Sequence, residues 1–516
     1  MDGDGGMTYL YRCIRLMFRA SAGVFYATTE VHGLDNLPPA GVPTILCFNH
    51  GNGLADPLVL IRTTPRMVRF CAKDTLWSIP IMKYFIRNSG AVPVYRRREH
   101  GDEAEKRNLD VFKTVIAALR QGACLGFAPE GVSRFLPYME QPLKTGVARI
   151  AIEAVQLAEQ AGQPNFGVRL APVGLIFTHR EKFRSDLCIR YCEPILVDKE
   201  VLHKYNDLHA AARDITQKLS TALEAVTINA PDWETTRLAI TAVRLHCPAG
   251  TDFTLGQYLT LLRGWVEVLK LGETAEQKQL KAALKNYQDL LDAKKIKCER
   301  VRRAQAVGQA LPWYWCAWGM FQRLMSALVL SAFAAPGLIL WRPVWLYLKR
   351  RERFLLAKGP RWNDSVAETK MLISFFVVSA FAVCCVAAGV LLWSPWPPML
   401  LVYLYLTMRC YEEAVADLRS AYTLYKLLFL TPKTMAAMVE RRKAALAELE
   451  KSKRHLPPSV GEYINMSFDE ALPTRSLDYY FPWWLARLLM LFYKRQKKDW
   501  NEVLRLSDYG TMDYIE

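Results

Sequence analysis

Apolar and polar positions divide the chain into three successive patterns. From Pro43 to about Asp198, short runs of β-branched and aromatic residues alternate with segments whose apolar residues recur at helical spacing. This alternation is typical of an α/β domain. From Leu202 to Ala310 the pattern is helical and charged, and two long apolar blocks follow. The sequence therefore predicts an α/β domain, a helical module and a membrane region, in that order.

The α/β segment supplies enough short elements for one sheet with helices packed against it. The expected strands are Pro43–Phe48, Val68–Ala72, Ala91–Tyr95, Cys124–Ala128, Leu170–Phe177 and Cys188–Tyr191. The expected helices between them are Leu58–Thr63, Ile79–Arg87, Ala104–Arg120 and Gly146–Gln160. The fold class is α/β, with a mixed sheet flanked by helices. The expected boundaries are 1–40 for an N-terminal helical region, 41–200 for the α/β domain, 201–310 for the helical module, 311–410 for the apolar blocks and 411–516 for a basic helical C-terminal region.

The two apolar blocks, Trp313–Leu348 and Met371–Met408, are each longer than the roughly 20 residues that span a bilayer. Proline interrupts both blocks, at Pro336 and from Pro395 to Pro398, so each is compatible with a helical hairpin. Between residues 342 and 370, eight basic side chains stand against three acidic ones, which predicts a cytosolic connection by the positive-inside rule. We expect an integral membrane protein.

Amphipathic segments lie towards both ends of the chain. The residues from Tyr9 to Tyr26 combine apolar side chains with arginines, a pattern typical of a helix in the membrane interface or of an ordinary surface helix of the α/β domain. Phe481–Tyr493 is aromatic and is followed by basic residues, which favours a second interfacial helix. A partner-binding helix is the alternative there.

The net charge of +17 narrows the range of partners. A basic chain fits nucleic acid, a membrane surface or a polyanionic small substrate. The sequence has no zinc-finger spacing and no helix-turn-helix or RNA-binding signature, and its apolar blocks argue against chromatin. We therefore expect anionic lipid and an anionic substrate, and no nucleic acid. The twelve cysteines form no C-x-x-C pair, which predicts reduced thiols and no metal site.

One turn holds the clearest candidate chemistry. His50 follows the strand expected at Pro43–Phe48, and Asp56 follows it in the same turn. Ligands of open α/β sheets bind beyond the carboxyl ends of the strands, and a histidine beside a carboxylate can act as a general base. Because Pro57 and an apolar run come next, Asp56 also fits the N-cap of a helix. The pair is thus a catalytic dyad, or a turn histidine followed by a capping aspartate.

Three later strand ends add charged or packing residues. Arg96–Arg98 suit a phosphate or a solvated surface. Glu130 can accept a hydrogen bond from a substrate hydroxyl while Arg134 pairs with a phosphate, unless the two form a salt bridge that only fixes the turn. The apolar strand around Pro172 and Val173 fits a packing wall for an acyl chain or pantetheine.

Together these segments resemble the four ordered blocks of the glycerolipid acyltransferase superfamily, which share the 1-acylglycerol-phosphate acyltransferase-like domain. The blocks are Asn49-His50 to Asp56-Pro57, the arginine strand, Phe127–Arg134 and Pro172-Val173-Gly174. The runs that resemble its fungal-type glycerol-3-phosphate and dihydroxyacetone-phosphate acyltransferases are Leu143–Arg149, Thr178–Ser185, Pro231–Thr235 and Asp364–Lys370. One position departs from the usual first block, because Ala55 stands where the superfamily has its aspartate and Asp56 comes one residue later. The fungal-type branch is similar to this His-x-Asn-x-x-x-Asp-Pro form.

The resemblance implies transfer of an acyl chain from acyl-CoA to the sn-1 hydroxyl of glycerol 3-phosphate, or of dihydroxyacetone phosphate, in phospholipid and triacylglycerol synthesis. It implies that His50 is the base and that Asp56 orients it. The residues expected to bind the acceptor are Arg97, Glu130, Gly131, Ser133 and Arg134. Pro172 and Val173 are expected to form the acyl or CoA wall. Acyl-CoA is a co-substrate, and neither a cofactor nor a metal is expected.

Three other functions compete with this one. The acceptor is alternatively lysophosphatidate or a lysophospholipid. A catalytically silent relative that binds membrane lipid is the second, and Ala55 is its best argument. A transporter is disfavoured because ionisable residues are nearly absent from the apolar blocks. The expected location is the endoplasmic reticulum membrane, with the acyltransferase domain in the cytosol.

Overall fold

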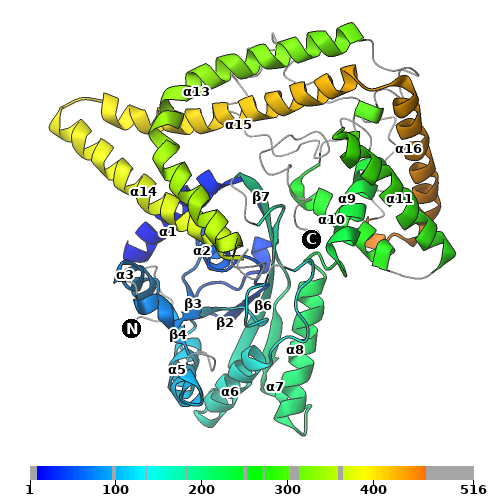
Figure 1. Cartoon of the computed structure of the whole chain (residues 1–516). Helices are drawn as coiled ribbons and strands as arrows, with labels where there is room; N and C mark the ends of the chain where they lie inside the picture. The colour runs from blue at the N-terminus through cyan, green and yellow to red at the C-terminus, as the bar shows by residue number, and fades with distance from the viewer. Residues whose placement is uncertain are drawn as a thin grey trace. The chain divides into compact units, whose positions relative to one another are not determined.

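The computed structural model describes residues 9–78, 80–95, 100–134, 136–180, 184–247, 253–270, 274–298, 300–302, 313–357 and 364–460 (Figure 1). They form two compact units. The first unit runs to Ile228 and takes in Glu352–Leu372, and the second contains the other described residues.

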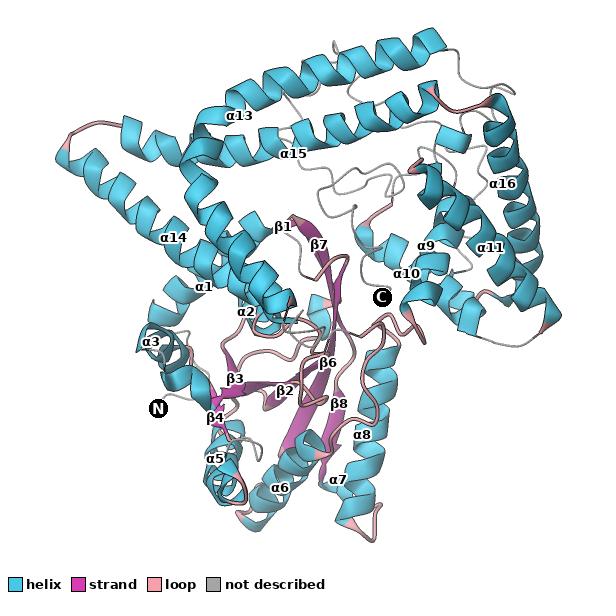
Figure 2. Cartoon of the chain, in the orientation of Figure 1, coloured by secondary structure: helices cyan, strands magenta, loops and turns pink. Residues whose placement is uncertain are grey.

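An eight-stranded mixed sheet forms the centre of the first unit (Figure 2). The strands are β1 (Tyr26–His32), β2 (Thr44–Phe48), β3 (Val68–Lys73), β4 (Val92–Val94), β5 (Cys124–Phe127), β6 (Gly167–Phe177), β7 (Ser185–Tyr191) and β8 (Ile195–Asp198). Their order is β1-β7-β6-β2-β5-β3-β4, and β8 also pairs with β6. Strand β2 is parallel to β5 and to β6, whereas β7 and β8 are antiparallel to β6. The predicted α/β class with a mixed sheet is confirmed.

Helices cover both faces of this sheet. They are α1 (Tyr9–Phe25), α2 (Ala55–Thr63), α3 (Pro80–Asn88), α5 (Glu103–Arg120), α6 (Gly146–Gln160), α7 (Lys199–Leu202) and α8 (Leu208–Glu224), with short turns η1 (Leu34–Asn36) and η2 (Asp74–Ser78). All six predicted strands and all four predicted helices of this unit are present, each within about three residues of its expected ends. Strands β1 and β8 were not predicted.

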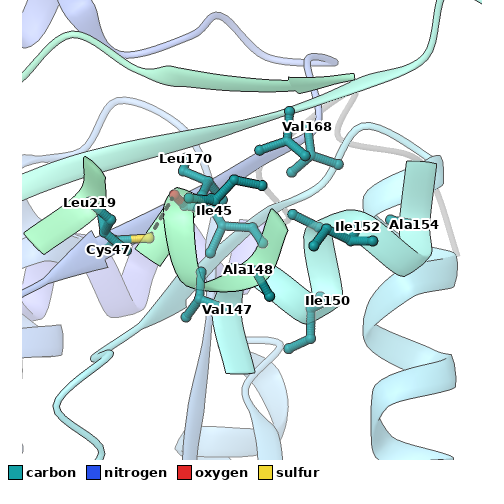
Figure 3. Close-up of a cluster of buried hydrophobic side chains, with 14 of the residues drawn as sticks. Ile45, Cys47, Val147, Ala148, Ile150, Ile152, Ala154, Val168, Leu170 and Leu219 are labelled. Carbon is teal, nitrogen blue, oxygen red and sulfur yellow. Dashed lines mark hydrogen bonds between the residues drawn. The ribbon is translucent and has the colours of Figure 1, made fainter. Parts of the chain in front are cut away.

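Strand β2 shows why both faces are covered. All of its residues are buried, and Ile45 and Cys47 belong to a cluster with α5, α6 and α8, whereas Leu46 and Phe48 belong to a cluster with α1 and α2. Successive side chains of a strand point to opposite faces, so a strand whose residues are all buried is covered on both sides. Figure 3 shows the first cluster, in which Ile45 and Cys47 lie among side chains of α6 and beside Leu219 of α8.

The first unit extends beyond the boundary expected at residue 200. Leu219 and Leu223 of α8 are buried in the first cluster. The chain after α8 also approaches β6 closely, because a Cβ added at Gly174 would lie 2.8 Å from a methyl carbon of Val226. The boundary therefore falls near Ile228, since α8 completes the core instead of starting the helical module.

Helix α1 packs one face into the second cluster. Tyr11 and Phe25 are buried there, whereas Tyr9 and Leu16 are exposed. This arrangement fits the alternative of a surface helix of the α/β domain.

The second unit is helical. Its helices are α9 (Trp233–His246), α10 (Leu255–Lys270), α11 (Ala275–Lys294), α13 (Trp313–Leu356) up to residue 351, α14 (Asp364–Leu391) from residue 373, α15 (Trp396–Leu428) and α16 (Pro432–Ser452), with turns η4 (Lys453–His455) and η5 (Pro458–Val460). The interfacial segment expected at Phe481–Tyr493 lies outside the described residues.

The first apolar block is one helix, and the hairpin expected for it is wrong. Helix α13 continues through Pro336 and Pro343, because an internal proline can kink a helix without ending it. Figure 1 shows the helix bending along its length. The second block is broken as expected, because α14 ends at Leu391 and α15 begins directly after Pro395.

Helices α13 and α15 pack against each other in antiparallel fashion. Ala334 and Cys410 form a buried pair between them, and a Cβ added at Gly337 would lie within 3 Å of three side-chain atoms of Thr407. Arg323 Nη1 lies 2.9 Å from Oδ1 of Asp417, whose side chain is 1% exposed. Arg323, one of the two arginines in the first apolar block, is therefore paired within this helix pair.

Two helices of the described chain are long and apolar enough to cross a membrane, judged by length and composition alone. They are Trp313–Leu356 and Glu368–Leu391, and only 22% and 17% of their most apolar windows are buried. Most residues of these two windows are therefore not buried against other described residues.

Candidate active site

The ends of three parallel strands bring the candidate residues together. Strand β2 lies between β5 and β6 and is parallel to both, so the segments that follow these strands leave the sheet at the same edge. His50 follows β2, Glu130 and Ser133 follow β5, and Arg180 follows β6. Residues far apart in the sequence consequently surround one turn.

His50 and Asp56 are in direct contact. His50 Nδ1 lies 2.9 Å from Asp56 Oδ2, and the same carboxylate oxygen accepts the backbone N–H of Asn52 at 3.0 Å. The Asp56 side chain is 0% exposed and that of His50 is 19% exposed. With Nδ1 bonded to the carboxylate, Nε2 is the nitrogen left for chemistry.

The added residue Ala55 does not separate the pair. Asp56 lies in the first turn of α2, which begins at Ala55, and Gly53 has a φ of +54° that folds the chain back. The expectation that Asp56 is the N-cap is wrong, because Leu54 occupies that position and the Asp56 carboxylate accepts from Asn52 and His50.

Glu130 and Ser133 hold the histidine turn. Glu130 accepts the His50 backbone N–H at 2.6 Å and that of Glu140 at 3.2 Å. Ser133 Oγ accepts the backbone N–H of Gly53 at 3.1 Å. Burial raises the pKa of Glu130, and the two backbone N–H groups oppose that rise. The structure thus gives both side chains a positioning contact in addition to the substrate contact predicted for them.

Arg134 lies in an ion pair, but its partner is Glu140, at 3.1 Å from Arg134 Nη1, and not Glu130. The Arg134 side chain is 54% exposed and can reach a ligand. Gly131, which lies between Glu130 and Arg134, has a φ of +75°. A Cβ added at Gly131 would lie 2.4 Å from Nζ of Lys144. Only glycine suits this conformation, which brings the amine of Lys144 over the turn. Arg97 lies outside the described residues.

The acyl or CoA wall expected at Pro172 and Val173 stays a prediction. Both residues are buried, and Val173 belongs to the cluster that β6 forms with α1 and α2. The centre of a strand that is covered on both faces offers its side chains to helices, not to a ligand.

Two families match different parts of the chain. Residues 28–176 match the family described as Acyltransferase, and residues 238–465 match the glycerol-3-phosphate acyltransferase 2 C-terminal domain. The chain thus carries an acyltransferase domain, followed by a region that matches the C-terminal domain of glycerol-3-phosphate acyltransferase 2. The resemblance of the four blocks is confirmed. The site residues from His50 to Val173 all lie within the range that matches the Acyltransferase family.

Two relatives from Saccharomyces cerevisiae extend this match. Glycerol-3-phosphate O-acyltransferase 2 is 24% identical over 481 residues, which make up 72% of this chain and 64% of the relative. Glycerol-3-phosphate O-acyltransferase 1 is 27% identical over 282 residues, 51% of this chain and 35% of the relative. The chain spans less than two thirds of the length of either relative. A third similarity is to the crystal structure of the 1-acyl-sn-glycerophosphate acyltransferase from Thermotoga maritima, with 20% sequence identity and a TM-score of 0.30. The alignment covers 42% of this chain and 81% of the Thermotoga maritima chain.

Sequence reasoning did not assign Arg180, which follows β6, to the site. Its guanidinium donates to the backbone oxygens of Arg134 and Leu136 at 3.1 and 2.9 Å, and it lies against Gly51, where a Cβ would be 3.2 Å from its central carbon. Arg180 thus joins the loop after β5 to the histidine turn. Arg180 lies in the run Thr178–Ser185 that resembles the fungal-type enzymes, and its place after β6, which adjoins β2, is the structural signal for this contact.

A second histidine and aspartate pair was also missed. His100 Nε2 lies 2.8 Å from Asp74 Oδ2, with side chains that are 22% and 17% exposed. These residues lie 26 positions apart and follow β4 and β3, so no local motif joins them. His50 is therefore not alone among the described histidines in lying against a carboxylate.

Proposed function

We propose that this chain transfers an acyl group from acyl-CoA to the sn-1 hydroxyl of glycerol 3-phosphate. The observation that carries the proposal is the 2.9 Å contact between His50 Nδ1 and the buried Asp56 carboxylate, on a turn whose backbone is held by Glu130 and Ser133. The two yeast relatives named glycerol-3-phosphate O-acyltransferases support the choice of acceptor.

In the proposed reaction His50 Nε2 removes the proton of the acceptor hydroxyl as its oxygen attacks the thioester carbonyl carbon. The carbon–sulfur bond of the tetrahedral intermediate then breaks, and the CoA sulfur leaves with the proton that the imidazolium returns. Asp56 holds the ring and stabilises the imidazolium, as the aspartate does in a Ser-His-Asp triad. The thioester is already activated, so the transfer needs neither an acyl-enzyme nor a cofactor.

The phosphate of the acceptor is proposed to bind beside the loop that follows β5. Arg134 is half-exposed there, and Lys144 lies over Gly131. Arginine and lysine are the common phosphate-binding side chains. We keep Arg97 as a further candidate on the predicted arginine strand. Dihydroxyacetone phosphate has the same phosphate and a hydroxyl in the corresponding position, so it is a second acceptor.

The apolar helices are proposed to place this domain at a membrane. The exposed apolar surface of α13 and α14 fits lipid, because large exposed apolar patches are unusual in soluble proteins. The basic connection between the two helices favours the cytosolic side. We propose the endoplasmic reticulum membrane with the acyltransferase domain in the cytosol, where acyl-CoA and glycerol 3-phosphate are available.

The test is an assay of purified full-length protein in detergent with acyl-CoA and one acceptor at a time, measured by free thiol release. The acceptors are glycerol 3-phosphate, dihydroxyacetone phosphate and lysophosphatidate. Thiol release that requires glycerol 3-phosphate supports the proposal. Release with lysophosphatidate alone assigns the alternative acceptor, and release with none of the three from folded protein indicates a silent, lipid-binding relative.

A further inference from the structure

Four side chains from three parts of the chain accept backbone N–H groups of the turn that presents His50. The donor and acceptor pairs are His50 with Glu130 at 2.6 Å, Asn52 with Asp56 at 3.0 Å, Gly53 with Ser133 at 3.1 Å and Leu54 with Glu368 at 3.4 Å. The first three acceptors lie inside the acyltransferase domain. The fourth is 314 residues away from the turn.

Glu368 belongs to a segment that is docked on the first unit. The end of α13 from Glu352 and the start of α14 up to Leu372 cluster with the α/β domain, whereas the rest of both helices belongs to the second unit. Met371 is 2% exposed within the cluster of α1 and α2, and Val366 is 1% exposed. Lys370 Nζ and Glu352 Oε1 form an ion pair at 2.6 Å, with side chains that are only 16% and 29% exposed. The Glu368 contact is therefore one part of a packed segment.

The position of the Glu368 carboxylate matters because Leu54 is the N-cap of α2. The leucine side chain has no oxygen that could accept the first N–H groups of the helix. The first N–H groups of a helix lack partners within the helix, and a negative charge at that end is favourable. Asp56 lies in the first turn of α2. A rotation of this turn therefore moves the Asp56 carboxylate relative to His50. Displacements of about 1 Å in such constellations lower rates markedly.

We propose that Glu368 is a positioning residue for the acyl transfer, acting from the start of α14 on the turn that holds His50 and Asp56. The proposal rests on the proposed function, since it concerns the rate of that reaction. It makes the first turns of α14, the helix that is proposed to enter the membrane, a structural part of the active site.

The experiment compares kcat and both KM values of the wild-type protein, Glu368→Ala and Glu368→Gln, in the full-length chain. Loss of one hydrogen bond to a charged acceptor corresponds to about a tenfold fall in kcat. We expect this fall for Glu368→Ala, with KM values for acyl-CoA and glycerol 3-phosphate within about twofold of the wild type. Glu368→Gln keeps an oxygen acceptor without the charge, so its kcat should lie between the other two.

Glu103→Gln is the matched control, because it removes a carboxylate that is 63% exposed and forms an ion pair with Arg107 on the surface of α5. Its kcat should equal that of the wild type. The inference is overturned if kcat of Glu368→Ala stays within twofold of the wild type, or if its KM for a substrate rises while kcat is unchanged. Where Glu368→Ala does not fold, a wild-type kcat for Glu368→Gln with a lowered thermal midpoint overturns it equally. An inactive wild-type protein instead refutes the proposed function, so the two failures are distinguishable.

Discussion

Replacing Asp56 by Asn tests the role of the carboxylate charge with little change in shape. Asp56 Oδ2 accepts both His50 Nδ1–H and the Asn52 N–H, whereas Oδ1 is buried and has no hydrogen-bond partner among the described residues. An asparagine oxygen in the Oδ2 position can therefore keep both hydrogen bonds. What the variant loses is the negative charge beside the ring.

The size of that loss follows from the short distance and the burial. Two unit charges about 4 Å apart interact by about 4 kcal/mol at an effective dielectric constant near 20. Because about 1.4 kcal/mol corresponds to a tenfold change in rate, removing the charge from beside a developing imidazolium should lower kcat by about 10³-fold. The full exclusion of the Asp56 side chain from solvent, at 0% exposed, leaves no water to replace it.

The assay is thiol release with glycerol 3-phosphate and saturating acyl-CoA, together with the thermal midpoint of each protein. Asp74→Asn is the matched control, because the His100–Asp74 pair has nearly the same length, 2.8 Å, on the same domain. It should leave kcat unchanged. The reasoning would be refuted if Asp56→Asn kept kcat within about fivefold of the wild type, or if Asp74→Asn lost as much.

Three further changes probe the site and the helix pair. Burial raises the pKa of Glu130 above its ordinary 4.5, so the wild-type folded state loses stability as pH rises above 4.5 and the carboxyl group must ionise. Glu130→Gln avoids this loss, so its thermal midpoint should rise relative to that of the wild type between pH 4.5 and neutrality, while its kcat falls. Thermal midpoints of the two proteins that change in parallel with pH would contradict this. Arg134→Ala should raise KM for glycerol 3-phosphate more than KM for acyl-CoA, and equal changes would reject a phosphate contact. Asp417→Ala should lower the free energy of unfolding by about 1–2 kcal/mol in a denaturant titration, less than a fully buried pair would lose because Arg323 is 43% exposed; an unchanged midpoint would show that the pair contributes nothing.

Local patterns predicted the elements that have a clear period. Strand β2 and helix α6 were expected from apolar runs bounded by turn residues, and the structure has them within a residue. Strand β1 escaped because its sequence, YATTEVH, is half polar and lies at the edge of the sheet. Helix α13 was misread because a proline in an apolar run marks a kink as readily as an end.

The site was predictable as far as its residues lie in short motifs. His50, Asp56, Glu130 and Ser133 were found in this way, because each follows a strand whose end could be placed. The roles of Glu130 and Ser133 in holding backbone N–H groups were not predictable, since they depend on how two loops meet at the edge of the sheet. Contacts across long separations, such as that of Glu368, leave no trace in a local pattern.

The most direct test of the account is the stoichiometry of acyl transfer by the wild-type protein and by His50→Ala. With acyl-CoA and glycerol 3-phosphate, the wild type should release one free thiol for each lysophosphatidate formed. His50→Ala should lose at least 10²-fold in kcat at an unchanged thermal midpoint, because general-base catalysis contributes about 10² to 10⁴ in rate. Transfer by folded His50→Ala at a rate within tenfold of the wild type would contradict the central claim.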